Sequence, residues 1–307
     1  MKKNLIKVTI ILSMLLLTLI PLSVNAAIVG DGTEASPFMI TNEAELELVT
    51  DFPDAHFKLA NDIVMTEELS VPLCYESENQ TFSGVFDGNG YAISNIIMEI
   101  DDYSSYATFI YKNEGTIKNL NIKNANFLGL GGCGITYQNK GTIDNCSISF
   151  KSCGGPDSST GIAYNNSGTI SKCYVSGDMY YSNGISHYNT GTISYCEVSA
   201  SLSPSSGGIV NSNKGTIENC SFVGSANETL DFGGISNTNY GLISKCKAIG
   251  DFSDDSSDIA GICCSNYSII ENCFFSGTLH LSHEYPSCFR HRRTASQANG
   301  QNTLPTY

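Results

Sequence analysis

Apolar residues recur along most of this chain at fixed places in a repeated block. The block reads Gly-Ile, three residues, Asn, one residue, usually Gly-Thr-Ile, two residues, Cys, one residue and an apolar residue. Its six clear copies start at Gly134, Gly161, Gly184, Gly208, Gly234 and Gly261. The spacers between copies vary in length, so the period runs from about 23 to 27 along the chain. A fixed block with variable spacers is typical of a rigid repeat scaffold that carries adjustable loops.

Four apolar stations within the block indicate short strands. The second and tenth residues are always Ile, the thirteenth is always Cys, and the fifteenth is Ile, Val, Phe or Ala. The last two stations alternate with polar residues, as in a strand with one buried face. The three-residue step from Ile to Cys breaks this alternation and predicts a corner that carries a polar pair such as Asp144-Asn145. Gly, Asn, Ser and Thr are frequent throughout, which disfavours helical repeats.

Two weaker copies of the block precede the six clear ones. One begins at Thr108, and another begins at Gly84 with Asn89 and Ile93 at the matching places. Equivalent residues of successive coils in a β-solenoid stack about 4.8 Å apart, so columns of Ile and Cys form a continuous dry core. The sequence therefore predicts an all-β chain folded as a parallel β-helix.

Six cysteines share the thirteenth station and form a predicted structural ladder. They are Cys146, Cys173, Cys196, Cys220, Cys246 and Cys273. Their neighbouring β-carbons would lie about 4.8 Å apart, which exceeds the roughly 3.5–4.5 Å of a disulfide. We therefore expect free thiols that pack as small apolar groups, although the count of 12 cysteines is even. Free thiols in an exported protein suggest an anaerobic habitat, and no cysteine pair has zinc-knuckle spacing.

Asparagine occupies the sixth station of the block and forms a second predicted ladder. Its members are Asn113, Asn139, Asn166, Asn189, Asn213, Asn239 and Asn266, with Asn89 as an earlier member. Most of them stand two residues before a Gly. We interpret the station as a turn position, where Asn tolerates left-handed backbone and its amide bonds the next Asn. A ligand-binding polar stripe is the alternative interpretation.

Residues 1–27 have the features of a secretory signal peptide. Lys2 and Lys3 begin a basic start, an apolar run extends from residue 8 to residue 20, and small residues follow as far as Ala27. The run is shorter than the roughly 20 residues that a spanning helix needs. No later segment is predicted to span a membrane, so we expect a secreted or cell-surface protein.

The remaining chain divides into three regions. Residues 28–100 form the N-terminal cap and first coils, where Asn42 with Glu45 begins a short helical pattern that would cover the open solenoid end. Residues 101–282 form the β-helix repeats. Residues 283–307 contain all three arginines and no block element, and we expect this atypical basic tail to be disordered.

The charge of the folded region is strongly negative. Residues 28–282 contain 10 Lys, no Arg and 29 Asp plus Glu, a net charge of −19. Such a surface repels phosphate backbones and anionic lipids. We therefore expect no nucleic-acid partner.

Several segments resemble a known family. The run Gly-Asp-Gly-Thr-Glu-Ala-Ser-Pro-Phe-Met-Ile from Gly30, then Phe-Lys-Leu-Ala-Asn-Asp-Ile and Phe-Asp-Gly-Asn-Gly-Tyr-Ala-Ile-Ser-Asn, is similar to the opening of bacterial surface proteins with GLUG-type repeats. Residues 207–210 and 215–220 resemble the repeat itself, although most copies depart from its Gly-Leu-Val-Gly core. The resemblance implies a right-handed parallel β-helix on an exported or cell-surface protein, often adhesive, with no catalytic residue to carry over.

These features predict a non-enzymatic exported repeat protein for adhesion or binding, with glycans or host and cell-wall surface molecules as partners. Its specificity would lie in the spacers, which start at Lys151, Asp178, Ser201, Ser225 and Asp251. No catalytic residue, metal or cofactor is predicted.

The alternative is a carbohydrate-active enzyme, either a polysaccharide hydrolase or a lyase. A lyase of acidic polysaccharides needs cations, and the solenoid has no Arg. A hydrolase needs two facing carboxylates, one of them protonated. The candidates are Glu99, Asp101 and Asp102, and the acidic spacer with Asp251, Asp254, Asp255 and Asp258. That spacer could also bind calcium, but its serine content fits a solvated loop better.

Overall fold

The computed structural model describes residues 28–69, 71–75, 80–99, 106–128, 134–154, 159–202, 207–227, 231–254 and 258–281. The predicted signal peptide and the predicted basic tail lie outside these residues. So do the candidate carboxylates Asp101, Asp102 and Asp255.

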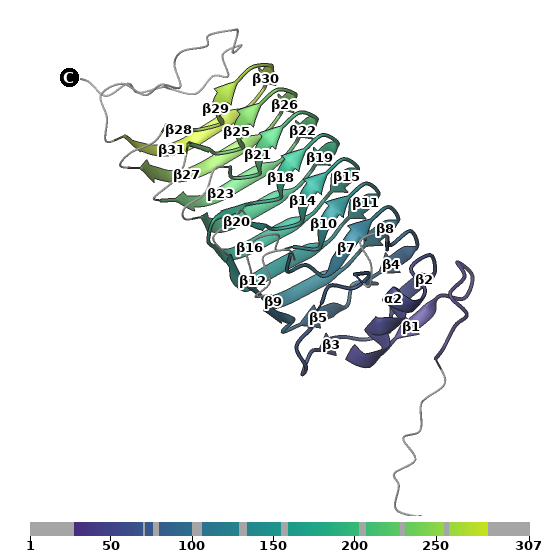
Figure 1. Cartoon of the computed structure of the whole chain (residues 1–307). Coiled ribbons are helices and arrows are strands. Elements are labelled where there is room, and N and C mark those ends of the chain that lie inside the picture. Colours follow the sequence, from purple (N-terminus) through teal and green to yellow (C-terminus); the bar gives the residue numbers. More distant parts are fainter. Residues whose placement is uncertain are drawn as a thin grey trace, which may run out of the picture.

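The described chain winds into a parallel β-solenoid with three sheets along its length (Figure 1). The Ile sheet has ten strands: β1 (Phe38–Ile40), β2 (His56–Leu59), β4 (Val85–Asp87), β8 (Thr116–Lys118), β11 (Thr142–Asp144), β15 (Thr169–Ser171), β19 (Thr192–Ser194), β22 (Thr216–Glu218), β26 (Leu242–Ser244) and β30 (Ile269–Glu271). The Asn sheet has seven: β7 (Ile110–Asn113), β10 (Thr136–Asn139), β14 (Ala163–Asn166), β18 (Ser186–Asn189), β21 (Val210–Asn213), β25 (Ser236–Asn239) and β29 (Cys263–Asn266).

The third sheet, which we call the Cys sheet, follows the cysteine station. Its strands are β3 (Ile63–Val64), β5 (Ala92–Ser94), β9 (Asn121–Leu128), β12 (Ser147–Gly154), β16 (Tyr174–Met179), β20 (Glu197–Leu202), β23 (Ser221–Ala226), β27 (Lys247–Asp254) and β31 (Phe274–Leu281), with β6 (Ile97–Glu99) paired to β9. Two short pairs join β13 (Ser159–Thr160) to β17 (Ser182–Asn183) and β24 (Phe232–Gly233) to β28 (Ile259–Ala260). The predicted all-β parallel solenoid is thus confirmed.

Strand register places identical block stations on top of one another. Ile143, for example, pairs with Ile117 in the coil before it and with Ile170 in the coil after it. The Ile stations and the fifteenth station are fully buried in the first five clear copies, and the Cys station there is at most 2% exposed. In the sixth copy Ile262, Ile270 and the other stations are only half-buried, because no described coil packs on them.

A short helix covers the N-terminal end, as predicted. A 3-10 turn, η1 (Glu43–Glu47), leads into α2 (Leu48–Asp51), which lies at the purple end of the solenoid in Figure 1. The side chain of Asn42 accepts from the backbone N–H of Glu45 at 3.2 Å. The Glu45 carboxylate reaches back to the N–H of Thr41 at 2.6 Å, so it closes a capping box one residue earlier than expected. Leu46 and Val49 join the solenoid core.

The corner after the Ile sheet carries the left-handed backbone of each coil. Its residues have φ between 52° and 55° and are Asn119, Asn145, Lys172, Tyr195, Asn219, Lys245 and Asn272. The predicted polar pair Asp144-Asn145 lies at this corner. The expectation of left-handed backbone at the Asn ladder was wrong, since its seven members from Asn113 to Asn266 do not have positive φ. They end extended strands, and the chain turns to the left-handed form only at the corner that follows the next strand.

The first weak copy of the block was placed in the wrong register. Phe86, not Ile93, pairs with Ile117 in the Ile sheet, and Ile93 pairs with Ile122 in the Cys sheet. Phe82 lies opposite Asn113, so Asn89 does not belong to the Asn ladder. The early coils carry a longer insertion than the later ones, which shifts the stations relative to the block.

A crowded corner explains the glycine at the eighth station. A β-carbon added to Gly168 would lie 2.1 Å from the carbonyl oxygen of Gly141 in the coil before it. The same overlap recurs at Gly191, Gly215 and Gly241. At these four positions a residue without a side chain lets successive coils approach this closely.

The spacers are more ordered than simple loops. Lys151, Asp178 and Ser201, where three spacers start, lie inside the strands β12, β16 and β20. The paired strands β13 and β17 come from the far ends of two spacers. The first spacer residues therefore lengthen strands of the Cys sheet, and the last ones form the short pair β13 and β17 just before strands β14 and β18 of the Asn sheet.

Candidate binding surface

The Asn ladder is an unbroken chain of buried amides along the solenoid. Each Nδ2 donates to the Oδ1 of the next coil at 2.8 Å, from Asn113 through Asn139, Asn166, Asn189, Asn213 and Asn239 to Asn266. Each of these donor amides except the first also contacts the carbonyl oxygen two residues ahead, as Asn189 does with Gly191 at 3.3 Å. The ladder begins at Asn113, whose Oδ1 is buried and has no donor. These amides lie inside the solenoid, so they hold coils together and are not available to a ligand.

The Cys ladder forms a second buried column. All ten cysteines in the described residues are free thiols, including the six of the ladder. Each ladder thiol donates to the carbonyl two residues earlier, as Cys196 does to Ser194 at 3.3 Å. Hydrogen bonding to Cys220 and burial raise the pKa of the Cys246 thiol to about 12. Such thiols are poor nucleophiles and poor metal ligands near neutral pH, so the column serves packing.

An aromatic column lies on the outer face of the Asn sheet. Tyr111, Tyr137, Tyr164 and His187 occupy the fourth station of successive coils. The rings stack along the axis, with centroids 5.2, 5.4 and 4.9 Å apart and interplanar angles of 14°, 25° and 6°. Tyr106 stacks on Tyr137 at 4.0 Å. The three tyrosines of the column are half-buried, whereas the third and sixth stations on either side of them face the core.

The column changes from rings to amides at His187. The Nδ2 of Asn211 lies 3.1 Å from His187 Nε2, and Asn237 Nδ2 donates to Asn211 Oδ1 at 3.2 Å. We call the continuous surface made by the fourth station from Tyr111 to Asn237, with Tyr106 and Tyr188, the outer stripe. Tyr188 is 46% exposed, and its ring stands edge-on to His187 at 4.2 Å and 82°.

His187 is the most enclosed member of the outer stripe. It is 6% exposed, and burial lowers its pKa to about 4. Its Nδ1 lies 3.1 Å from the amide of Asn183, whose Oδ1 is buried without a partner. A neutral imidazole carries one N–H. If the Asn183 amide is turned over, its Oδ1 accepts a hydrogen bond from His187 Nδ1–H. His187 is thus a neutral spacer between rings and amides.

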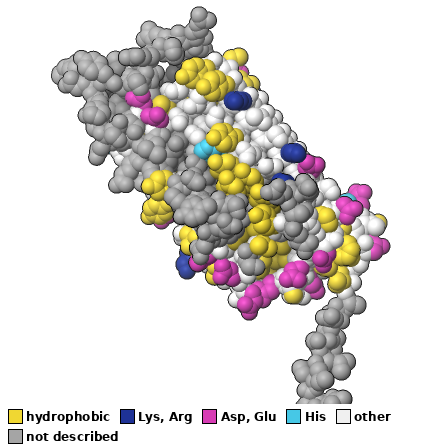
Figure 2. All heavy atoms as spheres, in the orientation of Figure 1, with side chains coloured by type: hydrophobic (Ala, Val, Ile, Leu, Met, Phe, Trp, Pro, Cys, Tyr) yellow, Lys and Arg dark blue, Asp and Glu magenta, His cyan; other side chains and the backbone are white. Residues whose placement is uncertain are grey.

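The outer stripe is uncharged on an acidic molecule. The seven strands of the Asn sheet, all described, contain no Asp or Glu and one cation, Lys112. In Figure 2 a band of apolar and tyrosine side chains runs along the solenoid, and the visible acidic side chains lie beside this band. The surface is therefore suited to an uncharged partner.

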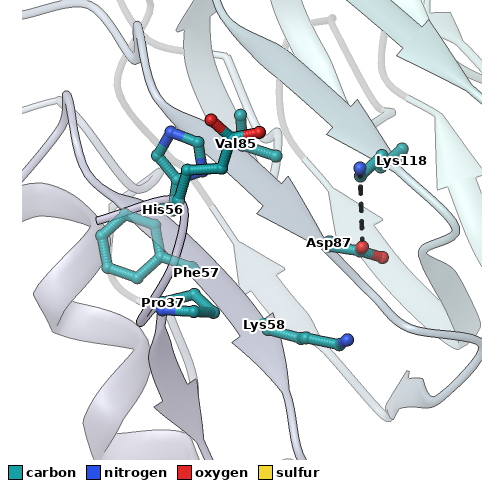
Figure 3. Close-up of a pocket in the computed structure, with 8 residues that line it drawn as sticks. Pro37, His56, Phe57, Lys58, Val85, Asp87 and Lys118 are labelled. Carbon is teal, nitrogen blue, oxygen red and sulfur yellow. Dashed lines mark ion pairs between the residues drawn. The ribbon is translucent and has the colours of Figure 1, made fainter. Parts of the chain in front are cut away.

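A separate hollow of about 200 Å³ lies on the Ile sheet near the N-terminal end. His56 and Lys58 of β2, Asp87 of β4 and Lys118 of β8 line it, and Figure 3 shows the ion pair of Asp87 with Lys118, 3.6 Å apart. Partial burial opposes ionisation of Asp87, but hydrogen bonds from the Asn119 side chain and another backbone N–H, with nearby lysines, lower its pKa. Asp87 therefore stays ionised and cannot be a protonated general acid.

Two of the described acidic candidates of the enzyme hypothesis take part in hydrogen bonds with neighbouring coils. Asp251 accepts from the backbone N–H of Thr278 at 3.1 Å, and the N–H of Asp258 donates to Asp231 at 3.2 Å. The part of the chain that the structure describes contains no group of three or more His, Cys, Asp or Glu arranged to hold a metal ion. The described helices include none long and apolar enough to cross a membrane.

Sequence reasoning missed the outer stripe. The fourth block station holds Tyr in three successive coils, a signal that was present in the sequence. It was overlooked because the station changes from Tyr to His to Asn, whereas the invariant Cys and Asn stations define the scaffold.

No family model and no curated protein matches the chain. Among solved structures, the chain is similar to a Bacteroides ovatus protein provisionally described as an immunoglobulin A1 protease. The two share 18% identity over 89% of this chain and 83% of that one, with a TM-score of 0.53. SRRP from L. reuteri 53608 matches at 12% identity over 79% and 98% of the two chains, but its TM-score of 0.30 is too low to argue from. The first likeness shows the β-solenoid fold alone.

Proposed function

We propose that this chain is a non-enzymatic binding protein that acts outside the cell and holds its ligand on the outer stripe. The signal peptide predicted for residues 1–27 supports export. The observation that carries the proposal is the outer stripe itself, where tyrosine rings in contact across successive coils stay half-buried on a sheet face whose strands hold one charged residue, Lys112.

The composition of the outer stripe favours binding. Tyr, Asn, Ser and Gly are the residues that antibody binding loops use most, because tyrosine offers a large contact area at low entropic cost and the small polar residues adapt their hydrogen bonds. Here Tyr188 is flanked by Asn165 and Ser212 at the fifth station of the neighbouring coils. The parallel sheet underneath holds these side chains at fixed spacing, so little ordering is needed on binding.

The enzyme hypothesis has weaker support. Hydrolysis of a glycosidic bond needs a carboxylic acid kept protonated beside a second carboxylate. Asp87 has a lowered pKa, and Asp251 already holds a backbone N–H. Neither lies on the outer stripe.

A binding panel tests the proposal. The purified chain would be passed over immobilised polysaccharides, mucin, collagen and fibronectin, with reducing-sugar release measured on each polysaccharide. The variant Gln138→Glu/Asn165→Glu adds two charges at the fifth station, beside the outer stripe, and keeps every ring of the stripe. The control Tyr240→Ala/Tyr267→Ala removes a stacked, exposed pair at another corner, with centroids 4.9 Å apart.

The expected result is binding without sugar release, lost in the charged variant and kept in the control. Equal binding by the wild type and the charged variant would overturn the site. Release of sugars at a rate that follows the protein concentration would favour the enzyme instead.

A further inference from the structure

The outer stripe differs in one respect from a flat aromatic platform. Ring planes that lie 14° to 25° apart, with centroids 5.2 to 5.4 Å apart, stack with an offset. The faces of Tyr111, Tyr137 and Tyr164 are therefore partly covered by their neighbours. The ring edges and phenolic hydroxyls of such a stack repeat at about the 4.8 Å spacing of the coils, and the Tyr137 hydroxyl is hydrogen-bonded to Tyr106. Phenolic hydroxyls both donate and accept hydrogen bonds.

Tyr188 supplies a ring of this surface that is turned across the stack. Its plane makes angles of 82° with His187 and 77° with Tyr164, and it is 46% exposed. A ring in this orientation can lie against the apolar face of a ligand. Beyond it, the outer stripe continues as the amides of Asn211 and Asn237, which again donate and accept hydrogen bonds.

Charge narrows the ligand class further. The described seven-stranded face has no carboxylate and one lysine, so it offers a single counter-ion to an acidic ligand. Residues 28–282 carry a net charge of −19, which repels polyanions at a distance. An acidic polysaccharide is therefore disfavoured both on approach and in contact.

We propose, on the basis of the function proposed above, that the ligand is a linear neutral glycan that lies along the solenoid axis. Its hydroxyl groups bond the tyrosine hydroxyls at the Tyr111 end and the amides at the Asn237 end, and one of its sugar rings rests on Tyr188. Tyr111 and Asn237 belong to strands β7 and β25, which are five steps apart in the Asn sheet. At about 4.8 Å a step the binding line is about 24 Å long.

The length of this line predicts how affinity depends on the ligand. Each added sugar contacts further hydroxyls or amides and raises the affinity until the glycan spans about 24 Å. Longer chains should bind no more tightly. Two ends of different chemistry, phenolic and amide, also give the glycan one preferred direction.

Calorimetric titration tests this inference on the full chain. The probes are neutral xylo-, manno-, cello- and chito-oligosaccharides from three to eight sugars, with oligogalacturonides as the acidic comparison. The variants are Tyr188→Ala, Tyr188→Phe and the control Tyr240→Ala/Tyr267→Ala, each checked for an unchanged thermal midpoint. Tyr188→Phe keeps the ring, so it separates ring stacking from a purely structural loss.

At least one neutral series should bind, with affinity that rises with length and then levels off. Tyr188→Ala should weaken it roughly tenfold, while Tyr188→Phe stays within about threefold. Tighter binding of oligogalacturonides than of neutral oligosaccharides would overturn the ligand class. So would an affinity for neutral oligosaccharides that is unchanged in Tyr188→Ala. If no oligosaccharide binds but collagen or fibronectin binding is lost in Gln138→Glu/Asn165→Glu, the ligand is a protein and the proposed function stands. If that charged variant binds like the wild type, both proposals fail.

Discussion

The Asn ladder should stabilise the solenoid most strongly where it is continuous on both sides. Replacing Asn189 by Leu keeps a similar apolar volume but removes two ladder bonds of 2.8 Å, from Asn166 and to Asn213. Buried polar groups left without a partner cost about 1–3 kcal/mol each. Asn166 keeps its Nδ2 contact of 3.4 Å with the Gly168 carbonyl, and Asn213 Oδ1 keeps the N–H of Gly215 at 3.2 Å. We therefore expect a loss of about 2–4 kcal/mol.

The matched control is Asn266→Leu at the last coil of the described ladder. It removes one ladder bond, from Asn239, together with the local bonds between its side chain and the backbone of Ser268. The site is half-buried, so we expect a loss of about 1 kcal/mol. Urea unfolding followed by circular dichroism measures both. Because each coil contacts only its neighbours, the Asn189 variant should also broaden the transition as the two halves uncouple. Equal losses for the two variants, or a loss under about 0.5 kcal/mol at Asn189, would refute the ladder's role.

Three further predictions concern buried or strained residues. The pKa of His187 is about 4 in the folded chain and near 6.5 in the unfolded chain, so its contribution to stability is full above about pH 6.5 and is lost as the pH falls toward 4. Relative to His187→Gln, the wild type should lose about 3 kcal/mol of unfolding free energy over that window. A stability difference between the two proteins that does not change with pH would contradict this. Iodoacetamide should label few of the 12 cysteines in the native chain but more than six in denaturant without reductant, as counted by mass spectrometry. Labelling of six or fewer cysteines in denaturant would show that disulfides are present. Tyr195 has φ 55°, so Tyr195→Asn should raise the unfolding free energy by about 0.5–1 kcal/mol in urea titration, and a destabilised variant would contradict the strain argument.

The repeat stations could be predicted because three apolar stations are invariant in the six clear copies and the fourth is always apolar. Ile143 and Cys146 recur in every clear copy at the same separation, and stacked coils bury such columns. The left-handed corner was harder to foresee, because Lys172 and Tyr195 occupy it as well as Asn. Tertiary stacking overrides the intrinsic preference of these two side chains for right-handed or extended backbone. Local sequence therefore marks the corner by the break in alternation but does not reveal its left-handed backbone.

The register of the first coils and the position of the binding surface could not be predicted from the repeated block. Register at Ile93 is set by pairing with Ile122, and a register is a property of two strands that one segment cannot reveal. The outer stripe arises from contacts between rings of successive coils, which lie far apart in the sequence, and their spacing alone did not distinguish them from ordinary surface tyrosines. Membership of the GLUG-type family and export from the cell stay predictions.

Hydroxyl-radical footprinting of tyrosine side chains tests the central claim most directly, namely that the outer stripe is the surface that holds the ligand. The chain has 16 Tyr and no Trp, so tyrosine modification can be followed residue by residue with and without the glycan that binds best. We predict that the ligand protects Tyr111, Tyr137, Tyr164 and Tyr188, while Tyr240 keeps its rate of modification. Protection confined to Tyr240, or an unchanged pattern at saturating ligand, would contradict the account.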